Sequence, residues 1–145
     1  MTDPVPAGPY VVVVVTLADL EGMIAELPEV TVGSKYGNHT WMVGKKGFAW
    51  ERPFSKADVK RFGDDPVPEG PILAVRVDYL GEKEAVLAAG QRGFFTIPHF
   101  DGYAAVLIQL KMASKKAVRE ALLDGWLSCA PPALASEYLA SRPRS

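Results

Sequence analysis

Two short runs of residues, each carrying a tryptophan, lie on either side of a glycine-bounded loop, and this feature constrains the fold most. The runs are residues 39–43 and 48–52, and the loop between them is Gly44-Lys-Lys-Gly47. Aromatic-rich runs joined by a short glycine-containing loop are typical of a β-hairpin. Because a hairpin pairs its strands antiparallel, we expect an antiparallel sheet that includes these residues.

Three more segments have strand-like sequences. They are residues 72–77, 94–97 and 103–110. The last two flank a segment that ends in Asp101-Gly102, a pair that suits a tight turn because glycine accepts positive φ and aspartate bonds back to the chain. Residues 29–38 are polar and punctuated by glycine, so we expect no strand or helix there. The sequence therefore predicts one antiparallel sheet of about five strands.

Helices are predicted before, between and after these strands. Thr16 can cap a helix whose apolar positions share one face and which Pro28 ends. Ser55 and Asp58 occupy the positions of a capping box at the start of a second, short helix that runs to residue 62. The others are predicted over residues 82–89, from Ser114 to Pro131-Pro132, and over residues 134–139. We expect the helices at both ends of the chain to cover one face of the sheet, which gives an α+β fold.

The chain has the length of one domain, 145 residues. We expect residues 1–15 to be a leader of uncertain structure, residues 16–140 to form the domain and residues 141–145 to be a flexible tail. Residues 11–15 are consecutive valines with strong strand propensity. Three interpretations of this run are open. It forms an extra strand of the sheet, it contacts a partner or a second copy of the chain, or the sequence starts at the wrong place.

The leader carries no sign of export or membrane insertion. It has no basic region and no small-residue cleavage site, so it does not read as a secretory signal. Its apolar run is far shorter than the roughly 20 residues that a membrane span needs. We therefore expect a cytoplasmic protein with no membrane partner.

Charge and reactive side chains exclude several familiar functions. Sixteen Lys and Arg against seventeen Asp and Glu give a formal charge of −1, whereas dedicated nucleic-acid binders usually have a basic balance or stripe. The single cysteine, Cys129, follows an apolar run and is predicted to be buried and inert. His39 and His99 are the only histidines, and no spacing resembles a zinc site. We predict no metal, no cofactor and no catalytic residue.

A series of short motifs points to a family. In the first half they are Leu27-Pro-Glu-Val30, Tyr36-Gly37 and Phe48-Ala-Trp-Glu-Arg-Pro53. In the second half they are Val75-Arg-Val77, Gly81-Glu-Lys-Glu84, Phe94-Phe-Thr-Ile-Pro-His-Phe-Asp-Gly-Tyr103, and the segment 121–139 with Trp126 and Ala130-Pro131. In this order they resemble the MmcQ/YjbR family over roughly residues 16–140. Residues 10–15 depart from the resemblance, because a polar, helical lead-in is expected there.

The resemblance implies a fold and a limited function. It implies a curved antiparallel sheet with flanking helices, likened to a "double-wing" DNA-binding arrangement. It also implies DNA as a partner and no established enzyme activity. The DNA-binding role comes from analogy between folds.

Exposed basic residues are the candidates for DNA contact. Lys45 and Lys46 lie at the predicted hairpin tip, where ammonium groups can reach phosphates without reading sequence. The densest basic group surrounds the start of the long helix and consists of Lys111, Lys115, Lys116 and Arg119. The alternative for both groups is solvated charge that keeps the surface soluble. The first hypothesis is thus a weak DNA-binding protein without enzymatic activity.

The second hypothesis is a module that binds a small molecule or a partner protein through an aromatic face. Its candidate residues are Trp41, Trp50, Arg76, His99 and Tyr103, which could stack a base or hold a small anion around a guanidinium. Strand alternation places residues 41 and 43 on one face, and residues 50 and 52 on one face. The sequence leaves open which face is buried, and both tryptophans could be core residues. A third hypothesis is an enzyme, with His99 oriented by Asp101 as a base.

Overall fold

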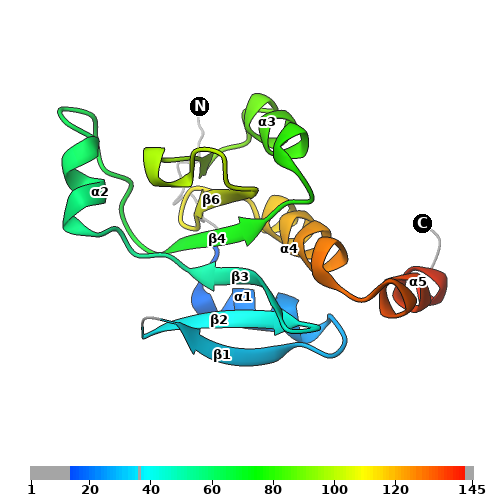
Figure 1. Cartoon of the computed structure of the whole chain (residues 1–145). Helices are drawn as coiled ribbons and strands as arrows, with labels where there is room; N and C mark the ends of the chain where they lie inside the picture. Colours follow the sequence, from blue (N-terminus) through cyan, green and yellow to red (C-terminus); the bar gives the residue numbers. More distant parts are fainter. Residues whose placement is uncertain (1–13, 36, 143–145) are drawn as a thin grey trace, which may run out of the picture.

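The structure is a computed structural model that describes residues 14–35 and 37–142. Within these residues the strands form one antiparallel sheet in the order β1-β2-β3-β4-β6-β5 (Figure 1). The strands are β1 (Thr31–Lys35), β2 (Asn38–Val43), β3 (Lys46–Glu51), β4 (Ile72–Arg76), β5 (Phe94–Phe95) and β6 (Ala105–Gln109). The helices are α1 (Leu17–Ala25), α2 (Lys56–Arg61), α3 (Leu80–Ala88), the 3-10 helix η1 (Pro98–Phe100), α4 (Lys115–Cys129) and α5 (Pro132–Ser141). The predicted α+β fold with an antiparallel sheet is confirmed.

The hairpin that anchors the prediction is β2 and β3, and its turn is tighter than expected. Gly44 and Lys45 both have positive φ, 55° and 76°. Positive φ at both central residues is the signature of a type I′ turn, whose twist matches that of the strands. Lys46 and Gly47 therefore belong to β3 and not to the loop.

The expectation of an irregular segment over residues 29–38 is wrong, because β1 lies there. β1 pairs with β2 from Thr31 opposite Met42 to Lys35 opposite Asn38. It is an edge strand, and Val32 remains 64% exposed. It is a strand because its backbone pairs with β2, the next element in the chain, and its described side chains, which are exposed, give no alternation of buried and exposed residues.

Side-chain caps set the starts of the helices as predicted. The Thr16 hydroxyl accepts from the backbone N–H of Asp19, and the Asp19 carboxylate accepts from the N–H of Thr16. Ser55 and Asp58 form the same reciprocal pair at α2. Asp thus serves where a capping box usually has Glu or Gln.

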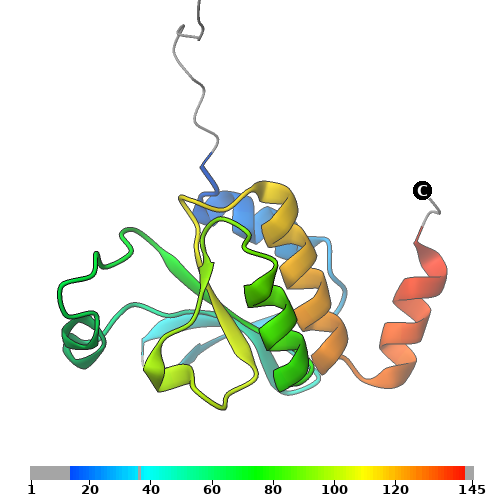
Figure 2. The same ribbon diagram turned by 90° about the horizontal axis from the view of Figure 1, so that it is seen from above.

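One face of the sheet, the helix face, packs against α1 and α4 (Figure 2), as expected from their places at the two ends of the chain. Its core includes Trp126, Phe48 and Leu122, none more than 1% exposed. A Cβ on Gly125 would lie 2.9 Å from Val75 Cγ1 and 3.0 Å from the carbonyl oxygen of Arg76. The missing side chain therefore lets α4 lie directly on β4. Cys129 is buried in this core, as predicted.

The first and last segments are described in part. Residues 11–13 of the valine run lie outside the described residues, so the extra strand proposed for them is not tested. Val14 and Val15 form an irregular approach to α1, and Val15 is buried in the core. At the other end, α5 turns away from α4 (Figures 1 and 2). Tyr138 of α5 packs on Trp126 with ring centroids 5.1 Å apart. Among the described helices, none has both the length and the apolar character to cross a membrane.

Candidate functional site

A β-bulge decides which side chains of β3 and β4 reach the face of the sheet opposite the helices, the second face. Trp41 pairs with Ala49 and Met42 with Gly47, so Phe48 is the extra residue of the bulge. Phe48 and Ala49 are both buried in the core of the helix face. Trp50 pairs with Ala74 and faces the other way, toward a second cluster that includes Phe100. The bulge thereby turns Phe48 inward and leaves room beside Trp50 on the second face.

The guanidinium of Arg76 fills this room. Continuing the β3–β4 register by one residue would place Phe48 opposite Arg76, and the inward turn of Phe48 lets Arg76 reach across to β3. Arg76 Nε donates to the carbonyl oxygen of Gly47 at 3.0 Å, and Nη2 donates to the Tyr103 hydroxyl at 3.0 Å. Its Cζ lies 5.8 Å from the Trp50 ring centroid and 5.4 Å from that of Tyr103. We call Trp50, Arg76 and Tyr103 the arginine patch.

Tyr103 reaches this position from a tight turn that the sequence predicted. Asp101 has φ −60° and ψ 132°, Gly102 has φ 74°, and the N–H of Tyr103 donates to the carbonyl of Phe100 at 3.0 Å. These values describe a type II turn. Phe100 is buried beneath it and packs against Trp50, with ring centroids 6.5 Å apart.

A lysine of α3 holds the same turn from behind. Lys83 Nζ donates to the carbonyl oxygens of Phe100 at 2.6 Å and Tyr103 at 2.8 Å. The side chain is only 6% exposed. Burial lowers the pKa of Lys83 below its ordinary value, and the nearby Asp101 carboxylate opposes that shift.

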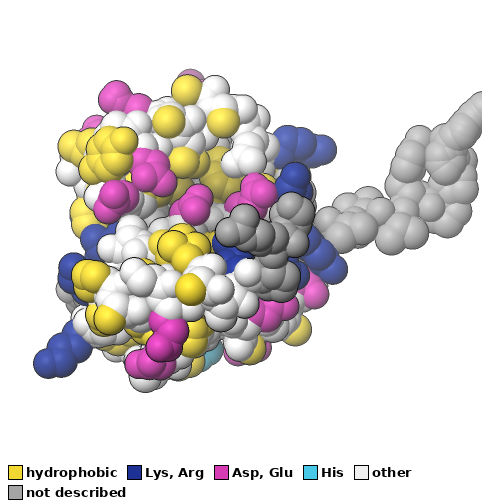
Figure 3. Space-filling view, turned by 90° about the vertical axis from the view of Figure 1, so that its right-hand side faces the viewer, with side chains coloured by type: hydrophobic (Ala, Val, Ile, Leu, Met, Phe, Trp, Pro, Cys, Tyr) yellow, Lys and Arg dark blue, Asp and Glu magenta, His cyan; other side chains and the backbone are white. Residues whose placement is uncertain are grey.

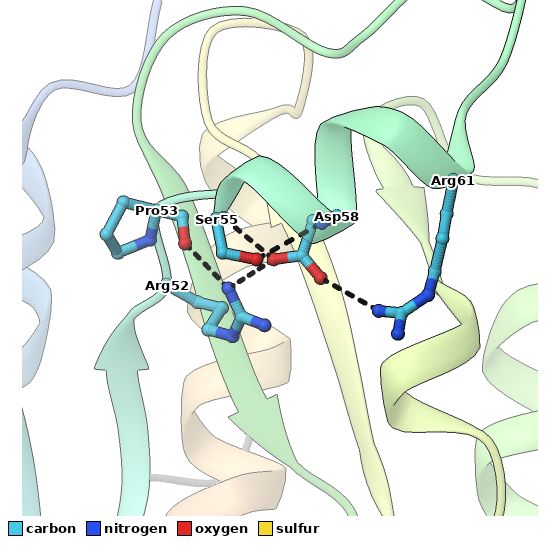
Figure 4. Close-up of polar contacts among 5 residues, drawn as sticks. All are labelled: Arg52, Pro53, Ser55, Asp58 and Arg61. Carbon is cyan, nitrogen blue, oxygen red and sulfur yellow. Dashed lines mark hydrogen bonds and ion pairs between the residues drawn. The ribbon is translucent and has the colours of Figure 1, made fainter.

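A second arginine on this face shows what Arg76 lacks. Arg52 lies over the Phe100 ring at 5.6 Å, and its Nη1 donates to Asp58 Oδ2 at 2.9 Å (Figure 4). Asp58 also accepts from the backbone N–H of Ser55 and lies 3.8 Å from Arg61 Nη1. Arg76 is half-buried in the same way, yet no carboxylate pairs with it among the described residues. Arg76 thus differs from Arg52 in that no carboxylate of the described residues pairs with its guanidinium.

The predicted aromatic set is only partly brought together. Trp50, Arg76 and Tyr103 meet, whereas Trp41 is buried in the core of the helix face. His99 is exposed on η1 and lies beside Phe100, with ring centroids 6.2 Å apart. No hydrogen bond joins His99 to Asp101 in the described part of the chain, so the catalytic pairing that the third hypothesis needs does not form there.

The six predicted DNA-contacting residues are all exposed, but acidic partners neutralise half of them. Lys111 pairs with Glu69, Lys115 with Asp19, and Arg119 with Glu26. Lys45, Lys46 and Lys116 have no ion pair among the residues that the structure describes.

The same six residues form two groups at opposite ends of α4. A Cβ on Gly44, in the hairpin turn, would lie 2.9 Å from Pro131, just beyond the last residue of α4. Lys115 is its first residue, and 15 residues of helix span roughly 22 Å. On the face in Figure 3, the basic side chains lie apart, mostly toward the two sides, with acidic side chains between them. The structure thus places no continuous basic stripe on this face.

Sequence reasoning missed Lys83 and Gly47 as parts of the site. Lys83 carried a signal, because it lies three and four residues before Val86 and Leu87, on the half-buried side of a short helix. A lysine in such a position has to find acceptors. Gly47 carried none, because its role depends on the bulge and on a contact with a strand 29 residues away.

Comparison with known proteins gives relatives without a stated function. The chain is 38% identical over 129 residues to the uncharacterized protein Mb2600 of Mycobacterium bovis, and the match covers 87% of this chain and 97% of that protein. The uncharacterized proteins MT2646 and Rv2570 of Mycobacterium tuberculosis match with the same identity and coverage. No protein-family model matches the chain, and no solved structure matches it.

Proposed function

We propose that this chain, which belongs to the family of the mycobacterial proteins Mb2600, MT2646 and Rv2570, is a binding protein that holds an anionic ligand on the arginine patch. The ligand carries an oxyanion, such as phosphate or carboxylate, next to a planar ring. The observation that carries the proposal is the half-buried Arg76 guanidinium, which lies against two aromatic rings and has no carboxylate partner among the described residues.

Hydrogen bonding supports an anion as the missing partner. A guanidinium has five N–H donors, and the protein supplies acceptors for Nε and for one Nη2 proton. The edge formed by Nη1 and Nη2 thus still has protons to donate, and this edge suits a bidentate oxyanion. Tyr103 accepts from Arg76 through its hydroxyl oxygen, which leaves its own proton free to donate to the same ligand. Burying a charge costs free energy unless the charge is paired, and a bound oxyanion would give the Arg76 guanidinium the negative partner that it lacks.

The exposed aromatic surface supports a planar ring beside the anion. Tyr103 is 38% exposed and its ring centroid lies 6.2 Å from that of Trp50. Stacking of a base on such side chains contributes about 1–3 kcal/mol in single-stranded nucleic-acid complexes. The patch therefore offers one charged contact and one stacking contact to the same molecule.

Adenosine 5′-monophosphate (AMP) is a suitable probe because it carries both chemical features. Calorimetric titration should give a higher affinity for AMP than for adenosine or inorganic phosphate. Arg76→Gln should weaken AMP binding roughly 10- to 100-fold, the factor expected for charge-assisted hydrogen bonds of about 1.5–3 kcal/mol. Arg92→Gln removes an exposed arginine outside the patch and should leave the affinity unchanged. Equal AMP affinity of Arg76→Gln and the unmodified protein contradicts the proposal.

DNA binding through the hairpin tip is the second candidate function. It is supported by Lys45 and Lys46, which project from a tight turn and have no ion pair in the described part of the chain. With a short DNA duplex as probe, the affinity should fall as salt rises, because phosphate contacts release counterions. Replacing both lysines with Glu should abolish binding, whereas Lys56→Glu with Lys60→Glu, an equal charge change on α2, should weaken it less. An affinity that does not respond to salt, or to the hairpin variant, eliminates this candidate.

The family assignment by motif and the absence of catalysis are also part of the proposal. Two of the motifs that resemble the MmcQ/YjbR family meet in the structure, because Lys83 of Gly81-Glu-Lys-Glu84 bonds to the Phe100–Tyr103 turn. A binding role without chemistry is supported by Cys129, which is buried, and by His99, which lies in the open beside an aromatic ring.

A further inference from the structure

We infer that Lys83 is a positioning residue of the arginine patch, which sets the place of the Tyr103 hydroxyl by holding both ends of the Phe100–Tyr103 turn. The inference rests on the proposed function and assigns a role to a residue that does not itself reach the ligand. Lys83 lies on α3, and the residues that it serves lie on β3, β4 and the turn.

The bonding pattern shows why the turn depends on this lysine. The carbonyl oxygens of Phe100 and Tyr103 belong to the first and last residues of a four-residue turn. Lys83 Nζ bonds to both, at 2.6 Å and 2.8 Å, and thereby closes a clamp across the turn. Between them Asp101 and Gly102 are exposed, and the backbone N–H of Asp101 donates to the carbonyl of Pro98 at 3.0 Å, within the same segment of the chain. Lys83 ties this segment to α3. The clamp therefore fixes where residue 103 leaves the turn.

The cost of burying the ammonium group indicates that the position matters. A charge in such a place is unfavourable unless hydrogen bonds compensate for the lost water. Here the compensation comes from two backbone carbonyls, with the Asp101 carboxylate nearby. A methionine would fill the same space without that requirement. The lysine is thus matched to the two carbonyls and not merely to the volume.

The consequence for the patch follows through Tyr103. The hydroxyl of Tyr103 is the acceptor for Arg76 Nη2, and its ring lies over the guanidinium. If the turn loosens, this acceptor moves and the guanidinium keeps only its bond to Gly47. The free edge of Arg76 then loses its fixed direction, and the hydroxyl no longer donates to the same ligand.

The test is a double-mutant cycle with AMP as the probe. Tyr103→Phe alone should weaken AMP binding roughly 2- to 10-fold, the range for one neutral hydrogen bond. Lys83→Met should weaken it by a similar factor, and in the Lys83→Met background Tyr103→Phe should have less than about a 2-fold further effect, because coupled residues are not additive. Lys83→Arg, which keeps a donor, should restore part of the affinity, and Lys116→Met on the surface of α4 should change nothing.

A measurement without ligand separates this inference from the proposed function. The ring protons of Tyr103 lie close to the Trp50 and Phe100 rings, so their NMR shifts report the position of the turn. They should move in Lys83→Met and return toward the original values in Lys83→Arg. Unchanged shifts in Lys83→Met, or fully additive losses in the cycle, overturn the inference even if AMP binds. If Lys83→Met does not fold, Lys83→Gln is compared instead, since its shorter chain does not reach both carbonyls. Absence of AMP binding by the unmodified protein contradicts the proposed function alone.

Discussion

Asp58 shows how single residues of this protein combine a local and a long-range task. Its carboxylate caps α2 through the N–H of Ser55 and also pairs with Arg52, which stacks on Phe100. Burial acts to raise the pKa of Asp58, but the hydrogen bonds from Ser55 and Arg52 outweigh it and hold the pKa below its ordinary value. The capping role was readable from sequence because it spans three residues. The pairing with Arg52 was not, because it depends on how α2 folds back.

Asp58→Asn should destabilise the protein at neutral pH by roughly 1–3 kcal/mol, the usual result when a buried charged partner is left unmatched. A carboxylate with a lowered folded pKa contributes stability above its unfolded pKa of about 4, and that contribution is lost as pH falls through the folded value. Urea unfolding at pH 7 and at pH 3 should therefore show a large difference between the two proteins at pH 7 and a smaller one at pH 3. Equal stability at pH 7 would show that the carboxylate contributes nothing.

Elements were predictable where their signals are local. The capping residues of α1 and α2 and the turn of the β2–β3 hairpin lie within a few residues of what they organise. β1 was missed although its partner β2 is next in the chain, because its described side chains are exposed at the sheet edge and show no alternation. The bulge at Phe48 was missed because it appears only when β2 and β3 are aligned. That bulge places Trp50 and Arg76 together, so sequence could name the residues of the patch but not join them.

The contact between α4 and the sheet gives a prediction at this scale. Gly125→Ala should destabilise the protein by about 1–3 kcal/mol, because the added Cβ meets Val75 and the backbone of β3 and β4. Gly22→Ala, in α1, has no atom within 4 Å of the new Cβ, and should leave stability unchanged or raise it by up to about 1 kcal/mol. Thermal unfolding of both variants checks the pair. Similar behaviour of the two would mean that α4 does not lie on the sheet as described.

At the scale of the whole molecule, the two faces of the sheet differ in the described part of the chain, and the proposed ligand site lies on the second face. The helix face carries the larger core, with α1 and α4 packed against it. The second face carries the smaller cluster around Phe100 and, beside it, the arginine patch. Near-neutral charge and paired surface cations fit a localised anion site better than broad electrostatic attraction to a polymer. The fold thus supports a small ligand site more directly than a DNA-binding surface.

Chemical-shift mapping of the ¹⁵N-labelled protein during titration with AMP shows which surface binds the ligand. The largest changes should occur at the Arg76 Nε–H, the Trp50 indole N–H and the Tyr103 amide, with smaller changes at Lys45 and Lys46. Saturable shifts at those three groups would establish the second face as the binding surface. Changes centred on the hairpin tip, or none at the arginine patch at saturating AMP, would contradict it.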